Sequence, residues 1–404
     1  MLKRVEIKNY KSIAQAVVDL NQFTVLVGPN GAGKSNFLDA LSFVSDCLTS
    51  SVELALNKRG GIGSVRWRSS GPRGRPTNFG MRLSMEVGPG HSSAYAFEIS
   101  AVKGGVFKVK EESCVIQESL LEEKAPRFHR QDGKVVLENL RFPRDELPIE
   151  TDRLALPILG AIPQFRPVYD LLAGMRFYSL APGRIRELQQ PDEGFVLKRD
   201  GSNAASVLQA LERHSEDGTY QYQRICEFLS RLVPGVIKVE HRTVGPKETL
   251  RFRQKGASKG SVSFDALNMS DGTLRILGVL LAVYQPSSPS VIGIEEPEST
   301  VHPAASEAIV DVLIDASHHS QVLTATHSPE ILDNKRIDVS QIKAVNWRDG
   351  KTLIGPVNEQ TRQLIRDGLC TPGELLATDE LVLDEEAAEE TANQLDLFGF
   401  TETG

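Results

Sequence analysis

The chain has 404 residues, of which 40% are hydrophobic and 25% charged, so it can bury a sizeable core as one large or two ordinary domains. Its longest apolar stretch, at residues 276–284, is too short to cross a bilayer, and its charged, strand-like start is unlike a signal peptide. The four cysteines are isolated and have no metal-type spacing, which is typical of reduced thiols in a cytoplasmic protein.

The net charge of −7 averages two different parts of the chain. Residues 374–404 hold ten acidic residues and no lysine or arginine, which leaves 46 basic against 43 acidic residues elsewhere. Such a segment is usually solvated or disordered, and sometimes serves as an interaction arm. We therefore expect a mildly basic folded body and a disordered tail. Residues 395–400 of this tail have the character of a partner-docking peptide, and a solubilising end is the alternative.

The first motif follows three predicted strands, at residues 2–9, 15–20 and 23–27. Gly28-Pro-Asn-Gly-Ala-Gly-Lys34-Ser35-Asn36 matches the phosphate-binding loop G-x-x-x-x-G-K-[ST] in full, and an apolar pattern of helical spacing continues to residue 48. Its glycines allow backbone N–H groups to surround a phosphate, and the helix dipole favours negative charge there. Lys34 is expected to reach the β- and γ-phosphates, and Ser35 to hold Mg²⁺.

Residues 54–85 contain seven basic residues and no acidic one, and their glycines and prolines predict a loop. This basic loop could contact nucleic-acid phosphates, or its arginines could be solvated or ion-paired. Strand-like runs at 79–87, 93–101, 106–110 and 113–117 predict an antiparallel sheet, and residues 118–174 suggest an insertion with some helix.

The middle of the chain has helical patterns at 203–214 and 220–232, followed by a hairpin pattern at 237–242 and 249–253. A helix is predicted at 270–284. Strands at 290–294 and 321–326 flank a helix at 303–316, and this alternation predicts a largely parallel sheet. No sustained heptads are present, so long coiled-coil arms are not expected.

Two carboxylates end the strand at 290–294, in Val-Ile-Gly-Ile-Glu295-Glu296-Pro. A strand end beside a phosphate loop is where a Mg²⁺-linked acid and a water-activating acid belong, so we assign Glu295 to Mg²⁺ and Glu296 to the attacking water. His327 follows the next strand, in Thr-Ala-Thr-His-Ser-Pro, and its neutral imidazole could contact the γ-phosphate.

A second anion site is predicted in Asn-Met-Ser270-Asp-Gly272-Thr-Leu-Arg, at a helix N-terminus. In one chain this site would duplicate the phosphate loop. It has a purpose if it contacts the γ-phosphate held by a second subunit.

In combination and order, these motifs resemble an ATPase of the ABC type, in the soluble branch with RecF, SMC and OLD-family proteins. The likeness runs from residue 1 to about 376 and is closest to AAA_21-like stand-alone ATPases, which occur in bacterial anti-phage defence systems. It rests also on Phe-Tyr-Ser-Leu at 177–180, Asp-Gly-Ser-Asn-Ala-Ala-Ser-Val-Leu at 200–208 and Pro-Glu-Ser-Thr-Val-His-Pro at 297–303.

The resemblance implies ATP and Mg²⁺ as cofactors, and it implies roles for matching positions. Residues 269–275 form the signature segment, 299–302 the D-loop, and His327 is the switch histidine. Lys11 resembles a basic residue that approaches the phosphates. The implied nucleotide-binding residues are Lys11, Asn30, Gly31, Gly33, Lys34, Ser35, Asn36, Ser270 and Gly272. Glu-Glu replaces the Asp-Glu of transporters, Met-Ser-Asp-Gly-Thr replaces Leu-Ser-Gly-Gly-Gln, and no glutamine is assigned to a Q-loop.

The predicted fold class is therefore α/β, a P-loop NTPase of ABC-ATPase type. We expect a mixed sheet, an antiparallel β subdomain and a helical lateral subdomain. The predicted divisions are an N-terminal ATPase lobe at 1–111, an insertion at 112–174, the remaining ATPase domain at 175–358, and C-terminal helices with the acidic tail at 359–404.

The predicted function is ATP hydrolysis by a head-to-tail dimer or higher oligomer that controls DNA transactions, or a separate nuclease or toxin effector, in bacterial defence. The alternative is a repair or recombination ATPase acting directly on DNA. No nuclease motif follows residue 339, so an effector would be a separate chain. A transporter subunit is less favoured, because it needs membrane partners.

Overall fold

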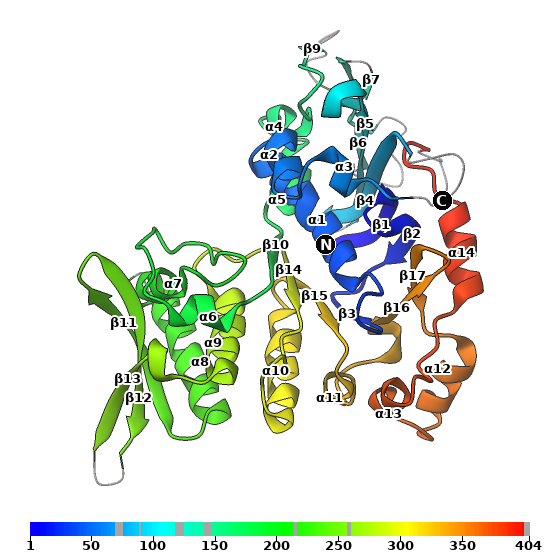
Figure 1. Ribbon diagram of the computed structural model, residues 1–404. Coiled ribbons are helices and arrows are strands. Elements are labelled where there is room, and N and C mark those ends of the chain that lie inside the picture. Colours follow the sequence, from blue (N-terminus) through cyan, green and yellow to red (C-terminus); the bar gives the residue numbers. More distant parts are fainter. Residues whose placement is uncertain are drawn as a thin grey trace. The chain divides into compact units, whose positions relative to one another are not determined.

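A computed structural model describes residues 1–68, 76–88, 90–117, 125–131, 133–140, 147–213, 216–256 and 260–399. The chain forms two compact units (Figure 1). Unit 1 comprises Met1–Met175, Val339–Leu369 and Asp379–Gly404, and unit 2 comprises Arg176–Asp338 and Cys370–Thr378.

Unit 1 contains an eight-stranded antiparallel sheet in the order β2-β1-β4-β5-β6-β7-β8-β9. Its strands alternate between buried apolar and partly exposed polar side chains. In β4, Met81 and Leu83 are buried, whereas Arg82 and Ser84 are partly exposed. The strands are β1 (Leu2–Tyr10), β2 (Ile13–Asp19), β4 (Asn78–Gly88), β5 (His91–Ala101), β6 (Phe107–Gln117), β7 (Arg127–Gln131), β8 (Lys134–Glu138) and β9 (Leu147–Pro148).

The helix that follows the nucleotide loop packs on this sheet. Phe43 of α1 (Lys34–Thr49) contacts Tyr10, Phe79 and Phe97 with ring centroids 5.6–6.4 Å apart, and all four side chains are fully buried. Burial of such rings is the main stabilising contribution here. Shorter helices complete this part of unit 1: α2 (Val52–Asn57), α3 (Ile62–Val65), η1 (Lys103–Gly105), α4 (Leu156–Leu159) and α5 (Arg166–Ala173).

Three further strands of unit 1 carry the nucleotide loop. The fully buried β3 (Phe23–Val27) pairs in parallel with β16 (Ile342–Arg348), which pairs antiparallel with β17 (Lys351–Pro356). β3 and β16 are far apart in the sequence, so local sequence patterns did not predict that they pair. The nearby helical segments are η3 (Val339–Gln341), α12 (Glu359–Arg366) and α14 (Glu385–Asn393).

Unit 2 has a parallel core of β10 (Arg176–Tyr178), β14 (Val291–Glu295) and β15 (Gln321–Thr326). The sequence predicted this parallel pairing of β14 and β15, because a helix, α10, connects the two strands. Its helices are α6 (Pro182–Arg186), α7 (Ala204–Arg213), α8 (Glu216–Leu232), α9 (Asp271–Tyr284), α10 (Pro303–Ala316), α11 (Pro329–Leu332) and α13 (Pro372–Ala377).

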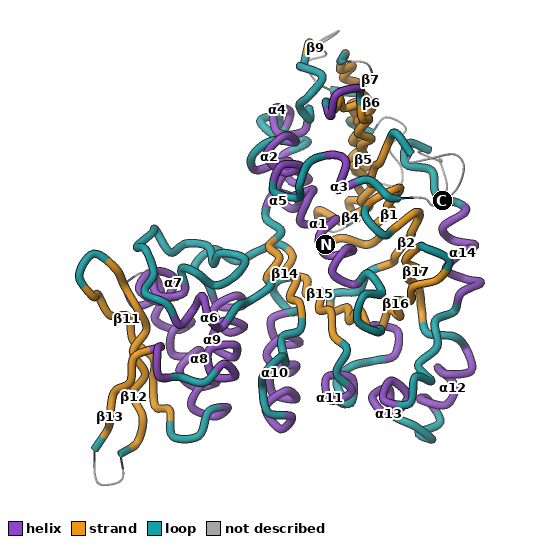
Figure 2. Tube along the Cα trace, in the orientation of Figure 1, coloured by secondary structure: helices purple, strands orange, loops and turns teal. Residues whose placement is uncertain are grey.

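Unit 2 also carries a small antiparallel sheet in the order β11-β12-β13. Figure 2 shows these strands beside the helices α7 and α8. Their bounds are β11 (Val236–Val244), β12 (Lys247–Lys255) and β13 (Ser261–Asp265), and η2 (Ala266–Asn268) follows. The predicted hairpin covers parts of β11 and β12. The sequence did not predict β13, because residues 261–265 are mostly polar and exposed.

The predicted fold class is confirmed, with parallel strands, an antiparallel β part and a helical part. Among the described residues the longest helix, α8, has 17 residues, so none is a coiled-coil arm. The expected divisions are placed differently. The boundary at residue 111/112 falls inside β6, because the antiparallel sheet continues through β7 and β8 into the expected insertion. The main segment of unit 2 ends at Asp338 rather than 358, and residues Cys370–Thr378 also belong to this unit.

The acidic tail differs from expectation, because it is folded as far as Gly399. Asp384 caps α14, and the helix lies against β17 and β2, where Ala388 packs on Gly355. Leu397 is only 4% exposed. Glu386, Glu389 and Glu390 therefore lie on the outer side of a packed helix. Residues 395–400, the expected docking peptide, are therefore held to the fold at Leu397. The last residue of this peptide, Phe400, lies outside the described residues.

The basic stretch at 54–85 also differs from a solvated loop. It contains α2, α3 and part of β4, and residues 69–75 lie outside the described residues. Arg59 is buried between Asp39 and Asp46, and Arg82 donates to backbone carbonyls of Asp396 and Gly399. These arginines stabilise unit 1, so they do not form the expected phosphate-contacting surface.

Candidate nucleotide site

The phosphate loop of unit 1 is closely packed from behind. A side chain at Gly28 would lie 2.0 Å from the carbonyl oxygen of Val345, and one at Gly33 would lie 2.1 Å from the hydroxyl of Thr352. Gly33 also has φ +114°, a conformation open mainly to glycine. These two glycines are therefore required for the loop to pass over β16 and β17, with its backbone available to an anion.

The loop side chains lie where a triphosphate would need them. Lys34 Nζ donates to the carbonyl oxygens of Gly28 at 2.6 Å and Pro29 at 3.1 Å, so its ammonium lies within the loop. Asn30, Gly31 and Ser35 are exposed. This cradle of backbone, ammonium and hydroxyl groups fits the phosphates of ATP.

A hydrogen-bonded set behind the loop was not predicted from the sequence. Thr352 Oγ1 donates to the carbonyl oxygen of Ala32 at 2.8 Å and lies 2.8 Å from Ser12 Oγ, which also accepts from Asn36 Nδ2 at 2.6 Å. Ser12 belongs to the Asn-Tyr-Lys-Ser motif at residues 9–12. No sequence signal marks Thr352, because it is 320 residues from Ala32 along the chain.

The family resemblance implied that Lys11 approaches the nucleotide phosphates. In the structure its ammonium group is paired with a carboxylate. Its Nζ lies 2.6 Å from Asp39 Oδ2, and Asp39 also accepts from Arg59 Nε at 3.0 Å and from the Tyr10 hydroxyl at 2.7 Å. Burial opposes ionisation of Asp39, but the charge of Arg59 and the hydrogen bond from Lys11 hold its pKa below the ordinary value. Asp39 therefore positions Lys11 in this structure.

The paired carboxylates of unit 2 lie at the end of β14. Glu296 has φ +45°, and its backbone N–H donates to the carbonyl oxygen of Ala325 on the neighbouring strand. This left-handed turn brings its side chain to His327, whose Nδ1 lies 2.9 Å from Glu296 Oε1. Glu295 lies 3.4 Å from the guanidinium of Arg199. The structure thus brings Glu296 and His327 together at one strand edge.

The signature segment begins α9 of unit 2. The Ser270 hydroxyl accepts from the backbone N–H of Thr273 at 3.2 Å, as an N-cap does. A side chain at Gly272 would lie 2.7 Å from the carbonyl oxygen of Thr300, so the signature segment packs directly on the D-loop. Arg186 holds the same turn through the carbonyl oxygen of Met269.

Two charged side chains near the site are buried, Arg275 at the end of the signature segment and Glu298 two residues after Glu296. Burial lowers the pKa of Arg275, and the nearby charges of Glu298 and Glu296 act against this shift. Burial raises the pKa of Glu298, although Thr326 donates to one of its oxygens. The Arg275 Nε and the other Glu298 oxygen have no hydrogen-bond partner among the residues that the structure describes. A buried charge without a partner is costly, so these groups are sensitive to any movement of α9.

The described residues contain no cluster of three or more His, Cys, Asp or Glu side chains that could hold a metal ion. A nucleotide-bound Mg²⁺ needs few protein ligands, because phosphates and waters complete its shell. Ser35 of unit 1 carries a hydroxyl group and Glu295 of unit 2 a carboxylate, and both are oxygen ligands of the kind that Mg²⁺ takes.

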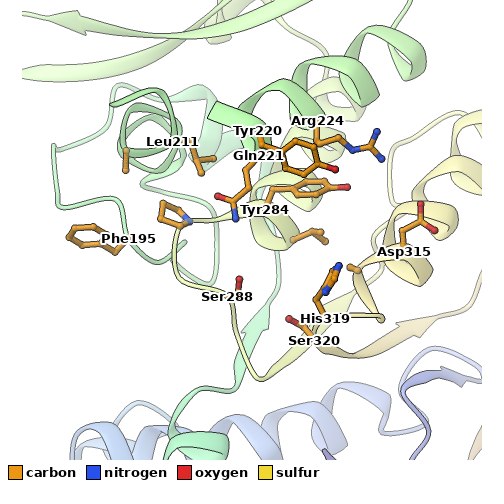
Figure 3. A pocket seen from close by; sticks show the side chains of 14 residues that line it. Phe195, Leu211, Tyr220, Gln221, Arg224, Tyr284, Ser288, Asp315, His319 and Ser320 are labelled. Carbon is orange, nitrogen blue, oxygen red and sulfur yellow. The ribbon is translucent and has the colours of Figure 1, made fainter. Parts of the chain in front are cut away.

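A separate cavity of about 710 Å³ occurs in unit 2, and none of the predicted site residues lines it. Figure 3 shows Tyr220 and Tyr284 close together, with Arg224, Asp315 and His319 on the right of the view. No described helix is both long and apolar enough to span a membrane.

The loop on β3, the carboxylates after β14 and the capped α9 define a P-loop ATPase of the ABC type. The profile of the family described as "AAA domain, putative AbiEii toxin, Type IV TA system" matches residues 23–333. The chain therefore belongs to this AAA_21 family, and the predicted ATPase is confirmed at the level of the family.

Similar proteins place the fold with the SMC heads. A solved SMC head bound to the C-winged helix domain of ScpA covers 90% of this chain and 99% of its own, with TM-score 0.53 and 14% identity. An SMC head from Pyrococcus furiosus, bound to the C-terminal domain of ScpA, covers 91% and 99%, with TM-score 0.51 and 13% identity.

Among curated proteins, the chain is 28% identical over 177 residues to structural maintenance of chromosomes protein 1 of Schizosaccharomyces pombe. It is 44% identical over 62 residues to the chromosome partition protein Smc of Methanocaldococcus jannaschii. These matches cover 42% and 15% of this chain, but only 14% and 5% of the two relatives. They confirm the predicted relationship to the RecF and SMC branch.

Proposed function

We propose that the chain is an ATP-driven switch that works on DNA as a head-to-tail dimer in the cytoplasm. Each ATP lies between the phosphate loop of one copy and the signature segment of the other. One observation carries this proposal: the chain has two helix starts suited to anions, α1 behind Gly33 and α9 behind Ser270. A single triphosphate held by one copy needs only the first.

The roles of the site residues follow from their chemistry. Lys34 and the loop N–H groups bind the β- and γ-phosphates, and Ser35 and Glu295 hold Mg²⁺, which supplies charge neutralisation to the phosphates. Glu296 orients and deprotonates the attacking water, and His327 contacts the γ-phosphate. Ser270 and Gly272 of the second copy contact the same phosphate, so its loss opens the dimer.

Lys11 has a conditional role in this proposal. Its ammonium is paired with Asp39, and the charge of the ATP phosphates would compete with that carboxylate for it. Asn30, Gly31 and Asn36 complete the loop around the nucleotide, and Asn36 also orients Ser12.

DNA is the favoured target, because the relatives named above act in chromosome maintenance and partition. A second candidate is control of a separate effector, such as a nuclease or toxin, in bacterial antiviral defence. The description of the family, which names a putative toxin of a type IV system, favours it. The SMC head solved with ScpA is a precedent for a head that carries a separate partner chain.

The test uses the purified chain and its Lys34→Ala variant, with and without a non-hydrolysable ATP analogue. We expect phosphate release and analogue-dependent dimers, measured by light scattering, from the wild type only. Lys34→Ala should lose nucleotide binding. Unchanged ATP affinity in that variant would refute the phosphate-binding role of the loop. ATP turnover by a strict monomer would refute the inter-subunit site.

The target is identified by purifying the native complex in both nucleotide states. Co-purification of nucleic acid supports the first candidate, and a stoichiometric protein supports the second. Association with membrane fractions would instead revive a transporter subunit.

A further inference from the structure

The β11-β12-β13 sheet of unit 2 has one covered face and one open face. On the covered face, Val239 pairs with Phe252, and Phe252 pairs with Phe264. The helices α7 and α8 lie against this face, where Tyr222 of α8 donates to the carbonyl oxygen of Val239. On the other face, Figure 1 shows no α-helix among the described residues of unit 2, although Thr249 near the start of β12 is only 3% exposed there.

The open face is basic. Because side chains alternate along a strand, every second residue from Lys238 and from Lys247 lies on it. The basic members are Lys238, Arg242, Lys247, Arg251, Arg253 and Lys255, and the acidic members are Glu240 and Asp265. This excess of cations contrasts with the net charge of −7 for the whole chain.

The arginines and lysines on this face are accessible. Side chains of Lys238, Arg242 and Arg253 are 37%, 41% and 45% exposed. Each carboxylate is shared: Asp265 pairs with Arg242 and Arg251, and Glu240 pairs with Lys238 and Arg253. Exposed ion pairs are weak, and a guanidinium has five donors, so these cations can still bind phosphates.

The spacing suits a linear polyanion. Arg251, Arg253 and Lys255 follow one another at every second position of β12, so their Cα atoms repeat at about 6.8 Å in a straight row. The aromatic rings of this sheet lie on the side opposite the basic face, where Phe252 is buried and Phe264 is 36% exposed. A basic face without rings on which bases could stack favours the backbone of a duplex over single strands.

We propose that the open face of β11, β12 and β13 binds the sugar–phosphate backbone of double-stranded DNA. This inference rests on the proposed action on DNA and adds the surface that makes the contact. In unit 1, Arg59 and Arg82 of the basic stretch at 54–85 are occupied within the fold, so these two arginines do not supply it.

The same surface is connected to the ATP site by the chain itself. Asp265 is the last residue of β13, η2 follows it directly, and Ser270 caps α9 two residues later. DNA phosphates that compete for Arg242 and Arg251 release Asp265 immediately before the signature segment. DNA binding is therefore expected to change the rate of ATP hydrolysis.

The experiment measures binding of a fluorescein-labelled 30-base-pair duplex by anisotropy over a range of salt concentrations, with and without a non-hydrolysable ATP analogue. The test variant is Arg251→Ala/Arg253→Ala/Lys255→Ala. We expect at least tenfold weaker binding, and a salt dependence reduced by about 0.9 for each lost phosphate contact. Arg242 still pairs with Asp265 in this variant, so ATP turnover without DNA should remain at the wild-type level.

The matched control is Arg127→Ala, because Arg127 is also an exposed arginine in a cross-strand pair, with Glu138 on β8. It should bind the duplex as the wild type does. Wild-type affinity in the triple variant would overturn this surface while leaving DNA action intact. Absence of duplex binding by the wild type in every nucleotide state would overturn both. Binding of poly-glutamate but not of the duplex would assign the face to an acidic protein instead.

Asp265→Asn tests the connection separately. It frees Arg242 and Arg251, so duplex affinity should stay equal or rise, while the change in ATP turnover caused by DNA should be lost. If DNA still changed turnover to the wild-type extent, the connection through Asp265 would be wrong.

Discussion

Nδ1 of His327 lies 2.9 Å from a carboxylate oxygen of Glu296, across the ends of two neighbouring parallel strands. Glu296 reaches this position through a left-handed backbone conformation, φ +45°, which is unusual for a residue with a side chain. Strain of this kind persists where the surrounding structure holds it, and it concentrates at functional sites. The pair joins the acid assigned to the attacking water with the histidine assigned to the γ-phosphate.

Replacement of Glu296 by Gln should lower ATP turnover about 100-fold or more, because a positioned base contributes about 10²–10⁴-fold. ATP affinity should be retained, so the variant should accumulate as a closed dimer on size-exclusion chromatography with ATP. Glu307→Gln, on the exposed side of α10, is the control and should behave as wild type. Turnover at the wild-type rate would mean that another residue activates the water.

Thr352→Val should weaken ATP binding about tenfold, because its hydroxyl joins Ala32 of the loop to Ser12. Isothermal titration with the non-hydrolysable analogue measures this effect. Thr24→Val is a matched control, since Thr24 is equally buried but bonds to Asn21, outside the loop. Both variants should lose about 1 kcal/mol of stability. Equal ATP affinity in both variants would mean that Thr352 does not support nucleotide binding.

Asp39→Asn should destabilise the fold by about 3 kcal/mol near neutral pH, because it leaves Arg59 and Lys11 without their shared carboxylate. The folded pKa of Asp39 is lowered, so its contribution is present above the unfolded value of about 3.8 and is lost as pH falls through the folded pKa. Urea unfolding from pH 7 to pH 3 should show the two proteins converging at the acidic end. A constant difference across this range would contradict the ion-pair account.

Leu397→Ala should lower stability by about 2–5 kcal/mol, because this side chain of the acidic tail is buried. Thermal unfolding measures the loss, and Glu390→Gln on the exposed side of α14 should leave it unchanged. If Leu397→Ala unfolded at the wild-type temperature, the tail would not be part of the folded unit. Deleting residues 383–404 is therefore expected to impair the whole chain, so it cannot test effector docking alone.

The local motifs were readable from the sequence because each has a short-range physical cause. Glycines that allow a tight loop, an apolar run that makes β14, and a serine before α9 all act within a few residues. Their order along the chain indicated the ATPase class. The same reasoning misplaced the tail, because a high density of acidic residues says nothing about whether the opposite side of a helix is packed.

The sequence by itself determined that the chain has a phosphate loop, paired carboxylates and a signature segment. Only the tertiary structure decided which residues support them. Thr352 reaches the loop, and Asp39 joins Lys11 to Arg59, through contacts between distant segments. The tertiary structure also decided which basic residues are accessible. Strand alternation places arginines of β11 and β12 on one face of a sheet, whereas Arg59 is buried within the fold. The physical reason is that burial and pairing depend on packing between remote segments, which local patterns do not encode.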